Sequence, residues 1–161
     1  MKPAAFLVAL TILAVAPLAS AGAADNESAR IFTQEMAQLV LGSPVVPSDR
    51  NSTADIKNGP VIVSQCSYST QSGETTTSVG LTLHRAATPE EAKSGFLSSK
   101  NIYKGQEITA LGDMAYRITA PAQLNVLKGT DWLIISAGAF PKPDPALQEK
   151  AARAILKTFR D

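Results

Sequence analysis

The chain has 161 residues, of which 45% are hydrophobic and 18% charged, a balance that suits one folded domain with its own core. The formal net charge is +1, which excludes the basic footprint of a nucleic-acid-binding protein or of a protein held by net charge on an anionic membrane. With a single cysteine the chain forms no internal disulfide, so its stability must come from packing.

Residues 1–21 have the pattern of a secretory signal peptide. Lys2 supplies the positive start, residues 4–15 are apolar, and Ala19-Ser20-Ala21 forms a cleavage motif, with a second possible cut after Ala23. The apolar stretch is too short and too rich in Ala and Pro to predict a spanning helix, and no cysteine follows it for a lipid anchor. We therefore expect a periplasmic or secreted protein that keeps no stable membrane anchor after signal cleavage.

The segment 22–60 is expected to contribute a helix and a connector to the same single domain as the body at 61–161. One apolar stripe follows the helical period over residues 26–41 and consists of Phe32, Met36, Leu39 and Val40. Gly42, followed by Ser-Pro, predicts the end of this helix. Residues 43–60 are rich in Pro and polar side chains, which predicts a long connector without regular structure.

From residue 61 the hydrophobic period changes to two, which predicts a hairpin of residues 61–69 and 76–85 with a loop at Ser72-Gly73-Glu74. In its second strand one face is apolar, with Val79, Leu81 and Leu83. The other face carries Ser78, Thr82 and His84. The first strand changes phase between Val63 and Cys66. A bulge or a late start of the strand near Ser64 would reconcile its two halves.

The pattern Thr88-Pro89-Glu90-Glu91 predicts the start of a helix that continues to about Ser99. Residues 102–110 are expected to add a short edge strand, and residues 114–119 alternate as a strand. A second hairpin is expected from residues 123–127 and 132–137, joined by the four-residue connection 128–131. Because its second strand is apolar on both faces, we expect that strand to be central and covered on each side.

Asp144 is expected to cap a last helix that begins at Pro145. Its buried stripe is expected to consist of Leu147, Ala151, Ile155, Leu156 and Phe159. The whole order of elements predicts an α+β fold, a mainly antiparallel sheet of five to six strands packed with about three helices.

Three short motifs occur in order along the body of the chain: Cys66-x-Tyr68, Leu111-Gly112-Asp113-x-Ala115-Tyr116, and a Lys128-Gly129 hairpin leading to Trp132. In this respect residues 60–160 resemble a loose group of small exported bacterial proteins of unknown function. The element order is also similar to that of PsbP-like α/β/α sandwiches. The resemblance implies an exported accessory or binding domain and supplies no catalytic residues.

The residues that could carry chemistry are few. His84, the single histidine, is expected to be a surface imidazole, and no second histidine or Cys-x-x-Cys pair completes a metal site. Cys66 is expected to be a buried structural thiol that packs with Tyr68. No glycine-rich phosphate loop or Gly-x-Ser-x-Gly elbow is present, so no cofactor is predicted.

Four residues are the candidates for a ligand or partner surface: Asp113, Tyr116, Lys128 and Trp132. Asp113 also suits a turn, where its carboxylate would accept backbone N–H groups, and Trp132 also suits the core. The sequence therefore predicts a non-catalytic binding or accessory protein, whose partner is a small molecule or an envelope protein. The alternatives are an envelope protein-interaction module and, less favoured, a small secreted enzyme using His84 and Asp113.

Overall fold

The computed structural model describes residues 26–48, 56–58, 61–70 and 75–159, so the leader-like segment and the loop at Ser72-Gly73-Glu74 lie outside the described residues. The described helices are α1 (Glu27–Ile31), α2 (Gln34–Leu41), α3 (Pro89–Tyr103) and α4 (Pro145–Leu156). The strands are β1 (Val45–Pro47), β2 (Ile56–Asn58), β3 (Val61–Thr70), β4 (Thr77–Arg85), β5 (Gln106–Ile108), β6 (Met114–Ile118), β7 (Gln123–Lys128), β8 (Asp131–Ala139) and β9 (Lys142–Pro143).

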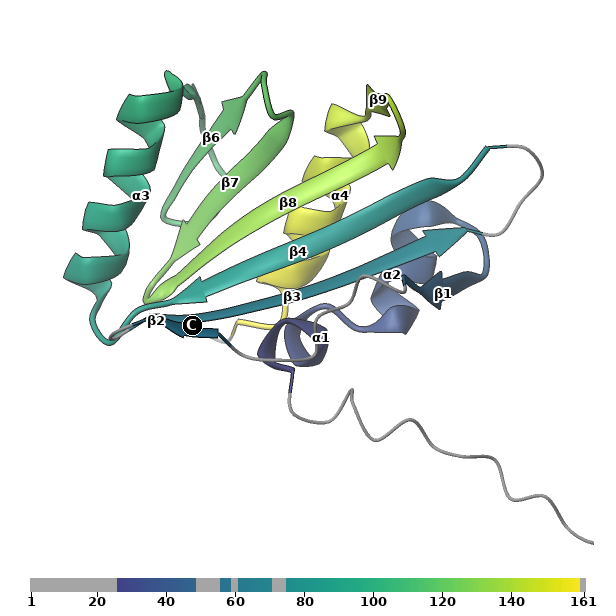
Figure 1. Cartoon of the computed structure of the whole chain (residues 1–161), viewed down its shortest axis with the longest axis horizontal. Coiled ribbons are helices and arrows are strands. Elements are labelled where there is room, and N and C mark those ends of the chain that lie inside the picture. The colour runs from purple at the N-terminus through teal and green to yellow at the C-terminus, as the bar shows by residue number, and fades with distance from the viewer. Residues whose placement is uncertain (1–25, 49–55, 59–60, 71–74, 160–161) are drawn as a thin grey trace, which may run out of the picture.

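All strands of the described residues join one antiparallel sheet in the order β1-β3-β4-β8-β7-β6-β5 (Figure 1). In addition, β2 pairs with the outer edge of β3, and β9 pairs with the end of β8 beyond the part that pairs with β7. The predicted α+β class is confirmed, although the sheet has more strands than expected. The additional strands are short, because β1, β2 and β9 each contain only two or three residues.

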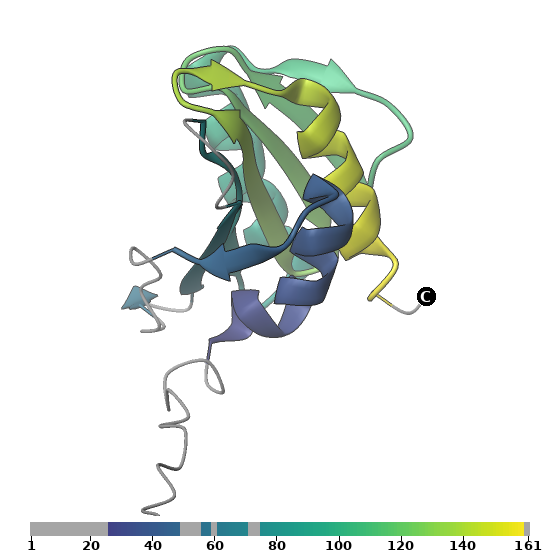
Figure 2. The same ribbon diagram turned by 90° about the vertical axis from the view of Figure 1, so that its right-hand side faces the viewer.

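Helices cover the two faces of the sheet unequally. On one face α1, α2 and α4 pack together with the sheet, and Figure 2 shows α2 and α4 on the same side. Their core includes Phe32, Val40, Leu81, Leu133 and Ile155, all buried. On the other face α3 alone forms a smaller apolar cluster over β6 to β8. Much of this second face therefore has no helix above it.

The predicted N-terminal helix is divided in two. α1 ends before Phe32, and Thr33 starts α2 by accepting a hydrogen bond from the N–H of Met36 at 3.3 Å. Because the helical phase restarts at this cap, the expected stripe is wrong at Leu39, whose side chain is 76% exposed. Gly42 ends α2 in the left-handed conformation with φ of 72°, as predicted.

Neither the bulge nor the late start predicted near Ser64 is present, since β3 begins at Val61 and its register with β4 is continuous from Ile62 to Ser69. Ser64 shares the buried face with Cys66 and Tyr68, although it is polar. Its Oγ accepts a hydrogen bond from the backbone N–H of Ser28 in α1 at 3.0 Å. The polar residue that interrupts the apolar pattern is therefore an anchor for α1 and leaves the strand regular.

The expectation of an irregular connector is also wrong at two points. β1 and β2 form within it because both pair with the same edge of β3, at opposite ends of that strand. Between them, two carbonyl groups of β3 accept other donors. The amide of Asn26 donates to the oxygen of Gln65 at 2.7 Å, and the N–H of Ser48 donates to that of Ser67 at 3.0 Å.

The remaining helix starts follow the sequence. Thr88 caps α3 by accepting from the N–H of Glu91 at 3.2 Å, and α3 continues beyond Ser99 to Tyr103. Asp144 caps α4 by accepting from two backbone N–H groups at 2.9 and 3.0 Å. The connection between β7 and β8 has two residues instead of four, because Lys128 already pairs with Asp131.

Candidate functional site

The part of the sheet that α3 leaves uncovered is the main candidate for a functional surface. We call it the open face, and it consists of residues that alternate with the buried ones on three neighbouring strands: Val63, Gln65, Ser67 and Ser69 of β3, Ser78, Gly80, Thr82 and His84 of β4, and Ile134 and Ser136 of β8. Each is at least partly exposed, and none is an acid, a lysine or an arginine. The open face is therefore uncharged apart from any proton on the imidazole.

A hollow of about 150 Å³ lies near the middle of the open face. Gly80 forms its floor, and its rim includes Gln65, Ser67, Thr82 and Ser136. A Cβ atom added at Gly80 would stand 3.2 Å from the Cβ of Ser67 and 3.4 Å from the Oγ of Ser136. The absence of a side chain at Gly80 thus creates the hollow, which hydroxyl and amide groups surround.

A second hollow, of about 370 Å³, adjoins the first and shares Ser136 with it. It lies between the β6–β7 and β8–β9 turns, and its lining is more apolar, with Pro121, Ala122, Phe140 and Pro141. The two hollows thus meet at Ser136, with polar groups around the one at the centre of the open face and apolar groups around the one at its end.

Trp132 and His84 mark the boundary between the open face and the cluster under α3. Their rings lie 4.8 Å apart between centroids, and Phe96 of α3 contacts the indole edge to face at 6.1 Å. The indole Nε1 donates to the side-chain oxygen of Asn125 at 2.9 Å. The expected surface imidazole is therefore half-buried, and this burial lowers the pKa of His84 from its ordinary value of 6.5.

Asp113 and Lys128 lie together, away from the open face, and tie the start of β6 to the β7–β8 turn. The carboxylate of Asp113 accepts the backbone N–H of Gly129 at 2.7 Å, and its other oxygen lies 3.6 Å from the Nζ of Lys128. Gly112 before it has φ of 62° and lies directly against the carbonyl of Leu127. These contacts give Asp113 the turn-stabilising role that its sequence context suggested.

Tyr116 is completely buried, so it belongs to the cluster under α3 and forms no part of an exposed surface. Its ring packs edge to face on Phe96 with centroids 4.7 Å apart, and its hydroxyl donates to the Oγ of Ser99 at 2.8 Å. Burial raises the pKa of the Tyr116 phenol. Of the four predicted residues, the structure brings Tyr116 and Trp132 into one cluster and Asp113 and Lys128 into another pair.

Cys66 lies on the opposite, helix-covered face. Its thiol is buried 3.7 Å from the carbonyl oxygen of Phe32, and the hydroxyl of Tyr68 donates to the same oxygen at 3.0 Å. Burial raises the pKa of the Cys66 thiol to about 11. Both side chains therefore fix the turn between α1 and α2 to the sheet, and the thiol stays protonated at neutral pH.

One charged cluster escaped sequence reasoning. Arg85 at the end of β4 forms a two-pronged ion pair with the buried carboxylate of Asp131, at 2.7 and 2.9 Å, and also contacts Glu27 of α1 at 2.8 Å. The hydrogen bonds that Arg85 donates to Asp131 raise the pKa of Arg85. The residues next to Arg85 in the sequence do not predict this cluster, because β4 and β8 are distant in the sequence and become neighbours only through the sheet order.

Within the described residues, no three His, Cys, Asp or Glu side chains gather closely enough to hold a metal ion. None of the described helices has the length and apolar character needed to cross a bilayer. Comparison with protein families, curated proteins and solved structures found no match to this chain.

Proposed function

We propose that the protein is an exported, soluble, non-catalytic binding or accessory protein of the bacterial periplasm, and that the open face is its binding surface. The export pattern of residues 1–21 supports the location. The observation that carries the binding role is the uncovered half of a sheet face, uncharged and hollowed in its centre around Gly80. An antiparallel sheet commonly leaves one face to solvent. This face differs from a plain solvated one in being hollowed and in having no acid, lysine or arginine.

The character of the open face indicates the kind of ligand. Hydroxyl and amide groups such as those of Gln65, Thr82 and Ser136 donate and accept hydrogen bonds without favouring either sign of charge. The apolar hollow beside Phe140 adds a region for a less polar group. The surface thus suits an uncharged ligand rich in hydrogen-bonding groups, such as an oligosaccharide or an extended uncharged peptide.

The enzyme alternative has less support from the geometry. His84 packs on Trp132, whereas Asp113 is engaged by Gly129 and Lys128 in a turn at the start of β6. A general base needs a partner that orients it and a reacting group within hydrogen-bond reach. Because these two candidates have separate partners, they do not form a base and its orienting acid.

The binding role is tested by NMR titration of the purified protein with a panel of neutral oligosaccharides and uncharged peptides. We expect chemical-shift changes at the open face for at least one class of probe, and their loss in Ser136→Arg, which would place a long cation over both hollows. Ser94→Arg, the same exchange at an exposed serine of α3, is the matched control. The proposal is wrong if every probe leaves the open face unperturbed, or if both variants respond equally.

The proposed location is tested separately by fractionating a bacterial host that expresses the full chain. The periplasmic or secreted fraction should contain protein whose N-terminus is Gly22 or Ala24. Recovery of protein that retains Met1, confined to the cytoplasm, would contradict export without bearing on the open face.

A further inference from the structure

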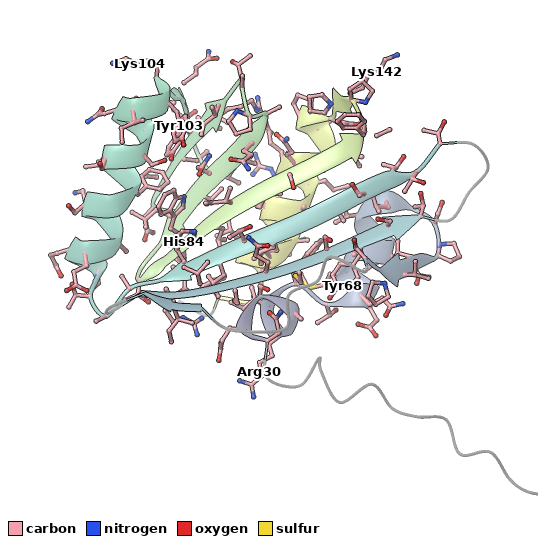
Figure 3. All side chains as sticks on the ribbon, viewed as in Figure 1. Arg30, Tyr68, His84, Tyr103, Lys104 and Lys142 are labelled. Atoms are coloured by element: carbon pink, nitrogen blue, oxygen red, sulfur yellow. The ribbon has the colours of Figure 1, made fainter. Side chains whose placement is uncertain are left out.

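Exposed apolar side chains gather at one end of the molecule, where several turns meet. Phe140, in the β8–β9 turn, is 100% exposed, and at the end of α3 Ile102 is 69% and Tyr103 52% exposed. Figure 3 shows Tyr103 and Lys104 at the upper end of α3 and Lys142 beyond β8 at the same end. We call this end, defined by Ile102, Tyr103, Lys104, Phe140 and Lys142, the turn edge.

The charges near the turn edge are not balanced. Two acids of the adjoining elements are in ion pairs, Glu149 with Arg117 at 2.8 Å and Glu107 with Lys100. Asp144 caps α4 and keeps its negative charge. Lys104 and Lys142 have no acid partner among the described residues. The free acids of α3, Glu90 and Glu91, lie in its first turn at the far end of the helix. The turn edge therefore combines exposed apolar groups with two lysines outside any ion pair of the described residues, and it keeps a net positive charge.

We propose that the turn edge docks reversibly on an anionic phospholipid surface, a role beyond the binding function assigned to the open face. Aromatic and aliphatic side chains at such an edge enter the boundary between headgroups and acyl chains, and neighbouring lysines contact anionic headgroups. The near-zero net charge of the chain does not oppose this, because the attraction depends on charges within a Debye length of the membrane.

The arrangement favours a lipid surface over a protein partner. Phe140 belongs to the β8–β9 turn, whereas Ile102 and Tyr103 belong to the last turn of α3. Figure 3 shows Tyr103 and Lys142 well apart along this end of the molecule, so the exposed apolar groups come from two separate places. A stable protein interface needs a contiguous, well-packed area, whereas separate side chains can each enter a fluid bilayer. Because only a few side chains take part, the contact is weak and reversible and is no stable anchor.

The test is co-sedimentation of the exported full chain with vesicles made of equal parts of phosphatidylglycerol and phosphatidylcholine, at low ionic strength. Exchange of Phe140 for Ser should weaken binding about tenfold or more, because a buried phenyl group is lost. Lys104→Gln and Lys142→Gln should each weaken it about fivefold, and added salt should do the same. Vesicles of phosphatidylcholine alone should bind far less protein.

Leu39→Ser is the matched control, since Leu39 is an exposed apolar residue of α2 outside the turn edge. All variants share one N-terminus, so residues at the start of the chain cannot produce differences between them. The proposal is overturned if anionic vesicles bind no protein, if Leu39→Ser weakens binding as much as Phe140→Ser, or if Phe140→Ser instead abolishes self-association or binding of a protein. Thr82→Ala changes the polar hollow, which neither Phe140 nor Lys142 lines. It should leave vesicle binding intact, which separates this result from the open face.

Discussion

Replacing Ser64 by Val should destabilise the protein, although it would restore the alternation of apolar residues in β3. The Oγ of Ser64 is the acceptor for the buried N–H of Ser28, at 3.0 Å. Leaving a buried donor without a partner costs about 1–3 kcal/mol. The added methyl groups offer about 0.8 kcal/mol each, which overpacking of a closely filled core offsets by about 1–3 kcal/mol. We therefore expect a net loss of about 1–3 kcal/mol in the free energy of unfolding.

Thermal unfolding followed by circular dichroism measures this loss, which corresponds to a fall in Tm of about 4–12 °C for a domain of this size. Ser69→Val is the matched control in the same strand, because Ser69 faces the open side and its exchange should change the free energy of unfolding by less than about 0.5 kcal/mol. If Ser64→Val is as stable as the original protein, the hydrogen bond to α1 does not explain the polar residue, and the reasoning fails.

Three further predictions follow from single residues. The buried thiol of Cys66, with its pKa raised to about 11, should resist iodoacetamide at pH 8 and react only after unfolding in urea; rapid labelling of the folded protein would contradict burial. Burial lowers the pKa of His84 below its ordinary value of 6.5, so the unfolded chain binds the proton first as the pH falls. The free energy of unfolding should therefore fall as the pH drops below about 6.5, and His84→Gln should lose this part of the pH dependence. Identical pH profiles for the two proteins would refute the burial of His84. Gly112→Ala should cost roughly 2–4 kcal/mol in urea unfolding, because its Cβ would stand 2.6 Å from the carbonyl oxygen of Leu127 at a φ of 62°, whereas Gly129→Ala meets no atom within 4 Å and should cost less.

Local chemistry made several elements predictable. Caps at Thr88 and Asp144 fixed the starts of α3 and α4, and Gly42 fixed the end of α2, because each satisfies backbone groups within a few residues of itself. The alternation of Val79, Leu81 and Leu83 likewise identified the buried face of β4. Such signals depend only on neighbours in the sequence.

Other elements depend on distant partners and gave no local signal. Ser64 appeared to break its strand because its partner, Ser28, lies in a helix 36 residues earlier. Strands of three residues such as β1 have no period of their own and exist because the edge of β3 is beside them.

The candidate site was less predictable than the fold. Asp113 and Lys128 were predicted as separate surface candidates and lie together in the structure, whereas Tyr116 is buried. The open face was not foreseen, since a serine-rich strand face has the same pattern whether solvent, a helix or a ligand covers it. The position of α3 decides what covers this face: α3 lies over β6 to β8 and leaves the same face of β3 and β4 without a helix.

The segments that pair with the outer edge of β3 affect the tendency of the protein to aggregate in concentrated solution. A strand of ten residues with a free edge is a template on which another chain can add a strand and begin aggregation. Here β1 and β2 occupy the two ends of that edge, and Asn26 and Ser48 bind the carbonyl groups of Gln65 and Ser67 between them. The opposite border, β5, offers only three residues. We therefore expect the folded protein to resist fibril formation even when it is crowded, and loss of the Asn26 contact to lower that resistance.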